Sequence, residues 1–346
     1  MNTRPRSATT VVALHYPTPV IPARFGRRLA VAHAVLSVLT AGACHREGGA
    51  VSVSGDVAQA ARVRTVPLAT ARALAENSAA AVSVARPGLI FSINDSGNDA
   101  VLFAFDTTGA DRGRWRLKGA TNRDWEAVAV ARCEPGGESW CVFVGDVGDN
   151  GGEREHVTIY RVPEPAPIGT GETGTLVPDA LDVRYDDHQH NVESLVVAPD
   201  GSLLLVTKEA ARARKGVRVR PTMVYRVASP RWGRDAAAAA VLVDSLPIVP
   251  GVAAGQSVTD AALAPDGRTL AMRSNRVLFV FAVDSATARP VPDRLPAMCD
   301  LSALRETQGE GVGFLHEEDG SRGRFVLSTE GKRESLRLVT CPLSSR

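Results

Sequence analysis

The chain has 346 residues, 44% of them hydrophobic and 23% charged, and its 40 Lys and Arg nearly balance its 38 Asp and Glu. Five of the basic residues and no acidic residue precede Cys44, so the rest of the chain carries a net charge of about −3. This balance does not indicate the clustered basic surface that nucleic-acid binding requires, and nucleic acid is excluded as the expected partner.

The N-terminal region has the pattern of an export signal. An apolar run from Leu29 to Thr40 follows three arginines and ends in small residues before Cys44. The run is shorter than the ~20 apolar residues that span a membrane as a helix, so residues 1–43 are predicted to be a signal peptide. Cys44 resembles the lipidated Cys of a bacterial lipobox, although Ala41 stands where that motif usually has Leu.

We therefore expect an exported protein of the cell envelope, periplasmic or on the outer surface, that meets the membrane only through a lipid anchor on Cys44. Ordinary cleavage and secretion is the alternative. Residues 44–59 are rich in Gly, Ala, Val and Ser and are predicted to form a flexible linker after the lipidated Cys.

The four remaining cysteines agree with export. An even number of Cys in an exported chain is typical of disulfides. Cys133 and Cys141 flank a Pro-Gly-Gly turn between two predicted strands, so a bridge between them is expected, which leaves Cys299 and Cys341 to join the last two repeats. A zinc site is the alternative, but the chain has no paired C-x-x-C spacing.

After the linker, short runs rich in Val, Leu, Ile and Phe alternate with Gly, Pro, Asp and Asn turns, which is typical of strands. Five repeats of this pattern begin with apolar strands at 79–85, 126–131, 193–198, 259–264 and 310–315. The first four repeats contain four predicted strands each, and the last contains three.

Such repeats predict an all-β, single β-propeller over residues 60–343, in which each repeat is one four-stranded blade. The spare strand Arg62–Leu68 is expected to complete the last blade and so close the ring, which removes an exposed sheet edge. We count five blades. Residues 160–192 or 284–308 could form a sixth blade, and a β-sandwich is the alternative fold.

In a propeller, the start of each first strand and the end of each second strand lie on the same face. The first strands open with Glu126, Glu193 and Glu310, and Thr259 holds the same place in the fourth repeat. The first repeat offers only Ala80 there, with Glu76 and Ser78 nearby. Asp260 is one residue out of register, so we expect its side chain to face the other way. The second strands end in Asn94, Asp95, Asp146, Lys208, Glu209, Arg273 and Glu330.

Crowded carboxylates repel one another and need cations or protons, and calcium prefers six to eight such oxygen ligands. The metal ligands expected at this acidic channel mouth are Glu126, Glu193, Glu310, Asp146 and Asp95. The further residues expected to bind a ligand are Asn94, Asp149, Asn150, Lys208, Glu209, Arg273, His190 and Glu330. The alternative is structural: each Glu caps its own blade through backbone N–H groups, and Lys208, Arg123 and Arg273 neutralise the mouth.

Several motifs resemble a family of exported bacterial propeller proteins, many of them lipoproteins. They are Asn94-Asp95-Ser96-Gly97-Asn98, Arg123-Asp124-Trp125-Glu126, Gly145-Asp146-Val147-Gly148-Asp149-Asn150, Tyr160-Arg161-Val162-Pro163, Glu193-Ser194-Leu195 and Thr207-Lys208-Glu209. More distantly, the pattern is similar to phytase-like esterase domains and gluconolactonase-like propellers. That similarity implies calcium at the channel mouth, held here by Glu126, Glu193 and Glu310.

Two functions therefore remain open beside a purely structural interaction scaffold. The first is a membrane-anchored propeller that binds a small molecule, a glycan or a protein at a calcium-containing acidic mouth. The second is a metal-dependent hydrolase of phosphoesters, esters or lactones. The chain has no G-x-S-x-G, H-E-x-x-H or phosphate-binding loop motif, so a metal-bound water would be the nucleophile in the second case.

Overall fold

The computed structural model describes residues 59–209, 220–228, 230–233, 235–250, 257–331 and 335–344. The predicted signal peptide 1–43, Cys44 and the predicted linker as far as residue 58 lie outside this part of the chain. Within the described residues, no helix is long and apolar enough to cross a membrane.

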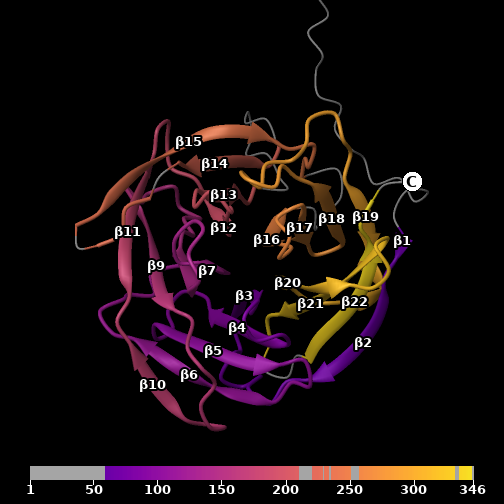
Figure 1. Ribbon diagram of the computed structural model, residues 1–346, viewed down its shortest axis with the longest axis horizontal. Coiled ribbons are helices and arrows are strands. Elements are labelled where there is room, and N and C mark those ends of the chain that lie inside the picture. Colours follow the sequence, from indigo (N-terminus) through magenta and orange to yellow (C-terminus); the bar gives the residue numbers. More distant parts are fainter. Residues whose placement is uncertain are drawn as a thin grey trace, which may run out of the picture. The chain divides into compact units, whose positions relative to one another are not determined.

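The described residues form an all-β propeller (Figure 1). Blade one comprises β3 (Asn77–Val82), β4 (Leu89–Asn94), β5 (Val101–Asp106) and β6 (Asp111–Leu117). Blade two comprises β7 (Trp125–Arg132), β8 (Trp140–Asp146), β9 (Val157–Pro163) and β11 (Asp179–Tyr185). Blade three comprises β12 (Val192–Val197), β13 (Leu203–Thr207), β14 (Met223–Val227) and β15 (Ala237–Ser245). Blade four comprises β16 (Val258–Leu263), β17 (Thr269–Ser274), β18 (Val277–Ala282) and β19 (Ala297–Asp300).

Blade five confirms the predicted closure of the ring. It comprises β20 (Gly309–Glu317), β21 (Arg322–Thr329) and β22 (Ser335–Pro342), with β2 (Arg62–Pro67) as its outer strand. The strand β2 pairs antiparallel to β22, so that residues from the two ends of the described chain share one sheet. The innermost strands β3, β7, β12, β16 and β20 each contact the next, and β20 contacts β3, so these strands surround a central channel (Figure 1).

Three short elements extend this frame. The strands β1 (Gln59–Ala60) and β10 (Thr173–Leu176) add parallel edge strands to blades four and one, and η1 is a single 3₁₀ turn (Ser302–Leu304). The outer strands β11 and β15 also pair in parallel, which joins blades two and three into one eight-stranded sheet. The segments considered for a sixth blade are thus used by β9 to β11 and by β19 and η1.

The cores lie between adjacent blades because each sheet is apolar on both faces. Trp125 shows this: its side chain is fully buried with residues of blades one and two, and its indole N–H donates to the Thr121 carbonyl at 3.0 Å. Burial of an aromatic ring with its polar atom satisfied stabilises such an interface.

Both predicted disulfides are present. The Cys133–Cys141 bridge links β8 to the residues just after β7, and the Cys299–Cys341 bridge joins β19 of blade four to β22 of blade five. The second bridge closes the longer loop, with a sequence separation of 42, and restricts the unfolded chain by about 4 kcal/mol on an entropic estimate. Disulfides of this kind are typical of oxidising compartments outside the cytoplasm.

Candidate functional site

All five inner strands carry a β-bulge at the same place near their start. The pairing register with the neighbouring strand shifts in each of them, and the extra residues are Ser78, Glu126, Glu193, Thr259 and Glu310, the last together with Gly311. We call these five residues the bulge tier. A bulge re-aims side chains next to functional sites, and here it brings five equivalent side chains to one end of the channel.

The bulges correct two sequence-based expectations. The counterpart of the three glutamates in blade one is Ser78 rather than Ala80. Asp260 was expected to face away because it is one residue out of register, but the extra residue in β16 breaks the strict alternation. Its carboxylate accepts hydrogen bonds from Val312 N at 2.8 Å and from Ala80 N at 3.2 Å, so it links blades one, four and five.

Glu193 is fully buried and has the best-defined partners of the tier. It forms an ion pair with Lys208 at 2.9 Å and accepts a hydrogen bond from the Asn191 amide at 3.0 Å. Burial raises the pKa of Glu193 to about 7, although Lys208 acts in the opposite direction. Burial alone would lower the pKa of Lys208. Its pKa is nevertheless raised, because the nearby carboxylates of Glu193, Glu310 and Glu126 stabilise the charged ammonium group.

Glu310 is the least satisfied member of the tier. It is buried, and neither carboxylate oxygen makes a hydrogen bond of ordinary geometry to a described residue. Burial raises its pKa to about 8, whereas Lys208 and the nearby Gln308 side chain lower it. A buried carboxylate without a partner costs free energy, so this position favours a proton or a cation.

Glu126 belongs to a second group of carboxyls. It accepts a hydrogen bond from the Ser78 hydroxyl, and burial, together with the charges of Glu193 and Asp95, raises its pKa to about 10. The carboxylates of Asp95, Asp124 and Glu126 each offer an oxygen, and these three atoms lie within 4.8 Å of one another. We call these three residues the carboxylate triad.

Asp124 is the triad member that the sequence interpretation missed as a ligand, although it stands in a quoted motif directly before Glu126. Burial and the neighbouring Asp95 carboxylate raise its pKa to about 6. Gly148 makes room for the triad, because a Cβ at this position would collide with the carboxylate of Asp124 and with Glu126. The side-chain amide of Asn122 donates a hydrogen bond to the backbone carbonyl of Asp95 at 2.8 Å and so fixes the loop that carries Asp95.

Some predicted residues bond to the protein itself rather than to the open mouth. Asp146 is buried in an ion pair with Arg154 at 2.9 Å and accepts from Asp124 N at 2.8 Å, so it positions the triad from behind. The buried Arg273 guanidinium donates to the Gly311 carbonyl at 2.7 Å and pairs with Glu306. Their charges are therefore largely compensated within the fold.

The other predicted residues lie around the same end of the channel. The Asn94 side chain holds the segment before β3, and Asp149 accepts from two backbone N–H groups of its own loop. The exposed Asn150 accepts from Asn191 at 3.2 Å, and Glu209 accepts from Thr207 at 2.9 Å. Burial and the charge of the Asp95 carboxylate raise the pKa of Glu330.

His190 belongs to a separate group with Asp187 and His188, whose potential ligand atoms also lie within 4.8 Å of one another. His190 Nε2 lies 3.0 Å from the Asp187 carboxylate, which also accepts from the Tyr225 hydroxyl at 2.8 Å. Burial lowers the pKa of His190, so the imidazole is neutral at neutral pH. This hydrogen-bonded group is built from the loop before β12 and does not include a member of the bulge tier.

No family model matches the chain, and no curated protein matches it. Among solved structures, a luciferin-regenerating enzyme is 9% identical, with 82% of this chain and 81% of that chain covered and a TM-score of 0.38. A GH43_1 enzyme from Xanthomonas citri is 10% identical, with 80% of this chain and 89% of that chain covered and a TM-score of 0.45. These likenesses are too weak to inform the chemistry of the mouth.

Proposed function

We propose that the acidic end of the channel is a calcium-binding site at which the protein engages a ligand. The carboxylate triad carries this proposal: three carboxylate oxygens of Asp95, Asp124 and Glu126 converge, and none of these residues makes an ion pair among the described residues. Hard divalent cations prefer such oxygen ligands, and calcium tolerates irregular geometry with backbone carbonyls and water completing the shell.

The other two glutamates of the bulge tier support the same site. Glu193 and Glu310 are buried beside the triad, and Lys208 compensates only part of their charge. The unsatisfied oxygens of Glu310 fit a site that gains a cation on binding its ligand. We propose Asn150, Glu209 and Glu330, at the edge of the same mouth, as the contacts for a small molecule, a glycan or a protein.

For localisation, we propose an exported lipoprotein anchored through Cys44. The two disulfides support an oxidising compartment, and the apolar segment followed by Ala-Gly-Ala-Cys supports export with lipidation. The acidic mouth would then face the medium outside the cytoplasmic membrane.

A metal-dependent hydrolase of phosphoesters, esters or lactones is the second candidate. Its specific support is Glu193, whose pKa of about 7 suits proton transfer near neutral pH. A divalent ion, when bound, polarises an ester or phosphoryl oxygen and activates water. Turnover of nitrophenyl phosphate, nitrophenyl acetate or gluconolactone that requires calcium and disappears in Glu193→Gln would favour the enzyme over a binding protein.

The binding proposal is tested by thermal unfolding of the protein without its signal peptide, first in EDTA and then with calcium. A ligand that binds only the folded state adds about 2.7 kcal/mol at a hundredfold excess over Kd, so the melting temperature should rise by several degrees. Asp124→Asn should abolish the rise, whereas Asp319→Asn, which changes an exposed turn residue, should retain it. An equal rise in both variants, or none in the wild type, contradicts the proposal.

A further inference from the structure

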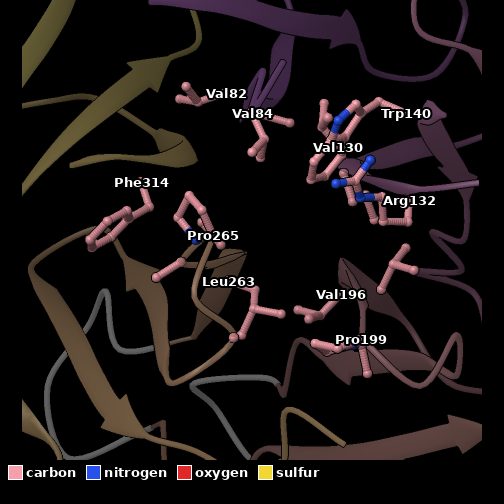
Figure 2. Close-up of a pocket in the computed structure, with 18 of the residues that line it drawn as sticks. Val82, Val84, Val130, Arg132, Trp140, Val196, Pro199, Leu263, Pro265 and Phe314 are labelled. Atoms are coloured by element: carbon pink, nitrogen blue, oxygen red, sulfur yellow. The ribbon is translucent and has the colours of Figure 1, made fainter. Parts of the chain in front are cut away.

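The opposite end of the channel is a pocket of about 490 Å³ (Figure 2). It is lined by the later residues of all five inner strands and by the turns that follow them. Asp260, which accepts hydrogen bonds from the backbone N–H groups of Ala80 and Val312, lies along β16 between Thr259 of the bulge tier and the lining residue Ala261. No residue of the bulge tier or of the carboxylate triad lines the pocket, so the inference below does not depend on the function proposed for the acidic mouth.

Most of the side chains that line this pocket are apolar, although Arg132 and backbone groups make part of its surface polar. Val130, Val196 and Leu263 are three of the Val, Ala, Leu and Pro residues that line it (Figure 2). No acidic residue lines it, and the hydroxyl of the lining Ser83 is already used, since it donates to Glu164 at 2.7 Å. A concavity within the 300–1,000 Å³ range of small-ligand sites, lined mostly by apolar side chains with one charged group, suits a molecule with an apolar body and a polar end.

One charged side chain lines the pocket, and its setting indicates what else the molecule carries. The Arg132 guanidinium lies 4.1 Å from the centre of the Trp140 ring, on one side of the pocket (Figure 2). It donates to the Glu138 carbonyl and has no ion-pair partner among the described residues. Stacking on the Trp140 ring holds the planar guanidinium in place. Its parallel N–H donors match the two oxygens of a carboxylate.

We propose that this pocket binds a small apolar carboxylate, of which a medium-chain fatty acid is the simplest example. The apolar body fills the channel between the inner strands, where it contacts Val196 and Leu263. The carboxylate lies at the rim on the Arg132 guanidinium, so that the single charge of the ligand remains paired and close to solvent.

The test is a fluorescence titration of the protein with dansylundecanoic acid, followed by displacement with dodecanoate and, separately, with the neutral dodecanol. Saturable binding and displacement by both compounds are expected. Leu263→Trp fills the pocket with a larger side chain and should abolish binding. Val177→Trp makes a comparable change at a position that is 73% exposed and should leave binding unchanged. Unaltered thermal unfolding of both variants confirms that they fold.

Arg132→Gln tests the charge of the ligand without disturbing the core, because Arg132 is exposed. Its affinity for dodecanoate should fall about tenfold, as for a lost charge-assisted hydrogen bond, while displacement by dodecanol is unchanged. Absence of saturable binding, or full binding by Leu263→Trp, overturns the proposal. An equal loss of affinity for dodecanoate and for dodecanol in Arg132→Gln overturns the assignment of a carboxylate group to the ligand. Self-association of the wild type that Leu263→Trp abolishes would instead identify the pocket as an interface between copies.

Discussion

The two ends of the channel are built from the same five strands but have opposite chemistry. Each inner strand carries a polar bulge-tier residue near its start, and its later part contributes mostly apolar residues to the pocket, with Arg132 of β7 as the charged exception. The starts bring together Glu126, Glu193 and Glu310, whereas the ends contribute no acidic side chain to the pocket. A repeated strand can thus create two different sites, because every blade places equivalent residues at equivalent heights in the channel.

The difference depends on the bulges rather than on strand composition alone. A regular strand would alternate its side chains between the two neighbouring blades, but the extra residue turns Glu126, Glu193 and Glu310 towards one mouth. Asp260 then follows the bulge in β16 and connects three blades between the two ends. Single substitutions at Asp260, Glu126 and Gly148 test this difference between the two ends.

The largest effect is expected for Asp260→Ala, which removes hydrogen bonds that connect blades one, four and five. The buried N–H groups of Ala80 and Val312 lose their acceptor, and each unsatisfied group costs about 1–3 kcal/mol. We expect the free energy of unfolding, measured by urea titration, to fall by about 3–5 kcal/mol. Asp284→Ala, which changes an exposed turn carboxylate, is the control. A loss no larger than in this control would show that Asp260 does not hold the blades together.

A smaller effect is expected for Glu126→Gln in EDTA, and it depends on pH. The pKa of Glu126 is about 10 in the folded protein and about 4.3 in the unfolded chain, so the folded state binds more protons between these values. Stability of the wild type should therefore fall as pH rises through this window.

The Gln variant lacks this titration, so it should be more stable than the wild type by about 2 kcal/mol near pH 8 in EDTA. Urea unfolding at about pH 5 and about pH 8 measures the difference. Saturating calcium should reverse the order of stability, because the variant loses a ligand. A wild type whose stability is independent of pH in EDTA would contradict the assigned burial of this charge.

The smallest effect is expected for Gly148→Ala, which changes only the acidic end. The added Cβ displaces the Asp124 carboxylate, so calcium affinity should fall about tenfold, or about 1.4 kcal/mol. Binding of dansylundecanoic acid at the other end should be unchanged. Gly151→Ala is a matched control in the same loop, because a Cβ there meets only ordinary contacts with Glu153. Equal calcium affinities in the two variants would count against the triad.

Much of the fold could be predicted because it is expressed locally in the sequence. Alternating strands and turns predicted the repeats, the missing last strand predicted closure by Arg62–Pro67, and the hairpin position of Cys133 and Cys141 predicted their bridge. These features depend on residues close in sequence or on a simple count of strands. The placement of Glu126, Glu193 and Glu310 at one mouth followed from the same repeat.

The remaining details depend on registers that sequence patterns do not reveal. A bulge adds one residue without a distinctive composition, so neither the role of Ser78 nor the inward position of Asp260 could be derived from alternation. Asp124 joins the triad only because the loop after β4 brings Asp95 beside it. The burial of Arg273 likewise depends on the carbonyl of Gly311, which belongs to the neighbouring blade.

The central claim is that the carboxylate triad binds calcium, and the most direct measurement is a calorimetric calcium titration of the protein after removal of metals with EDTA. We predict saturable binding with one calcium at the triad, lost in Asp124→Asn and retained in Asp319→Asn and Arg132→Gln. Absence of binding by the wild type, or undiminished binding by Asp124→Asn, would contradict this account and leave the carboxylates as structural groups of the propeller.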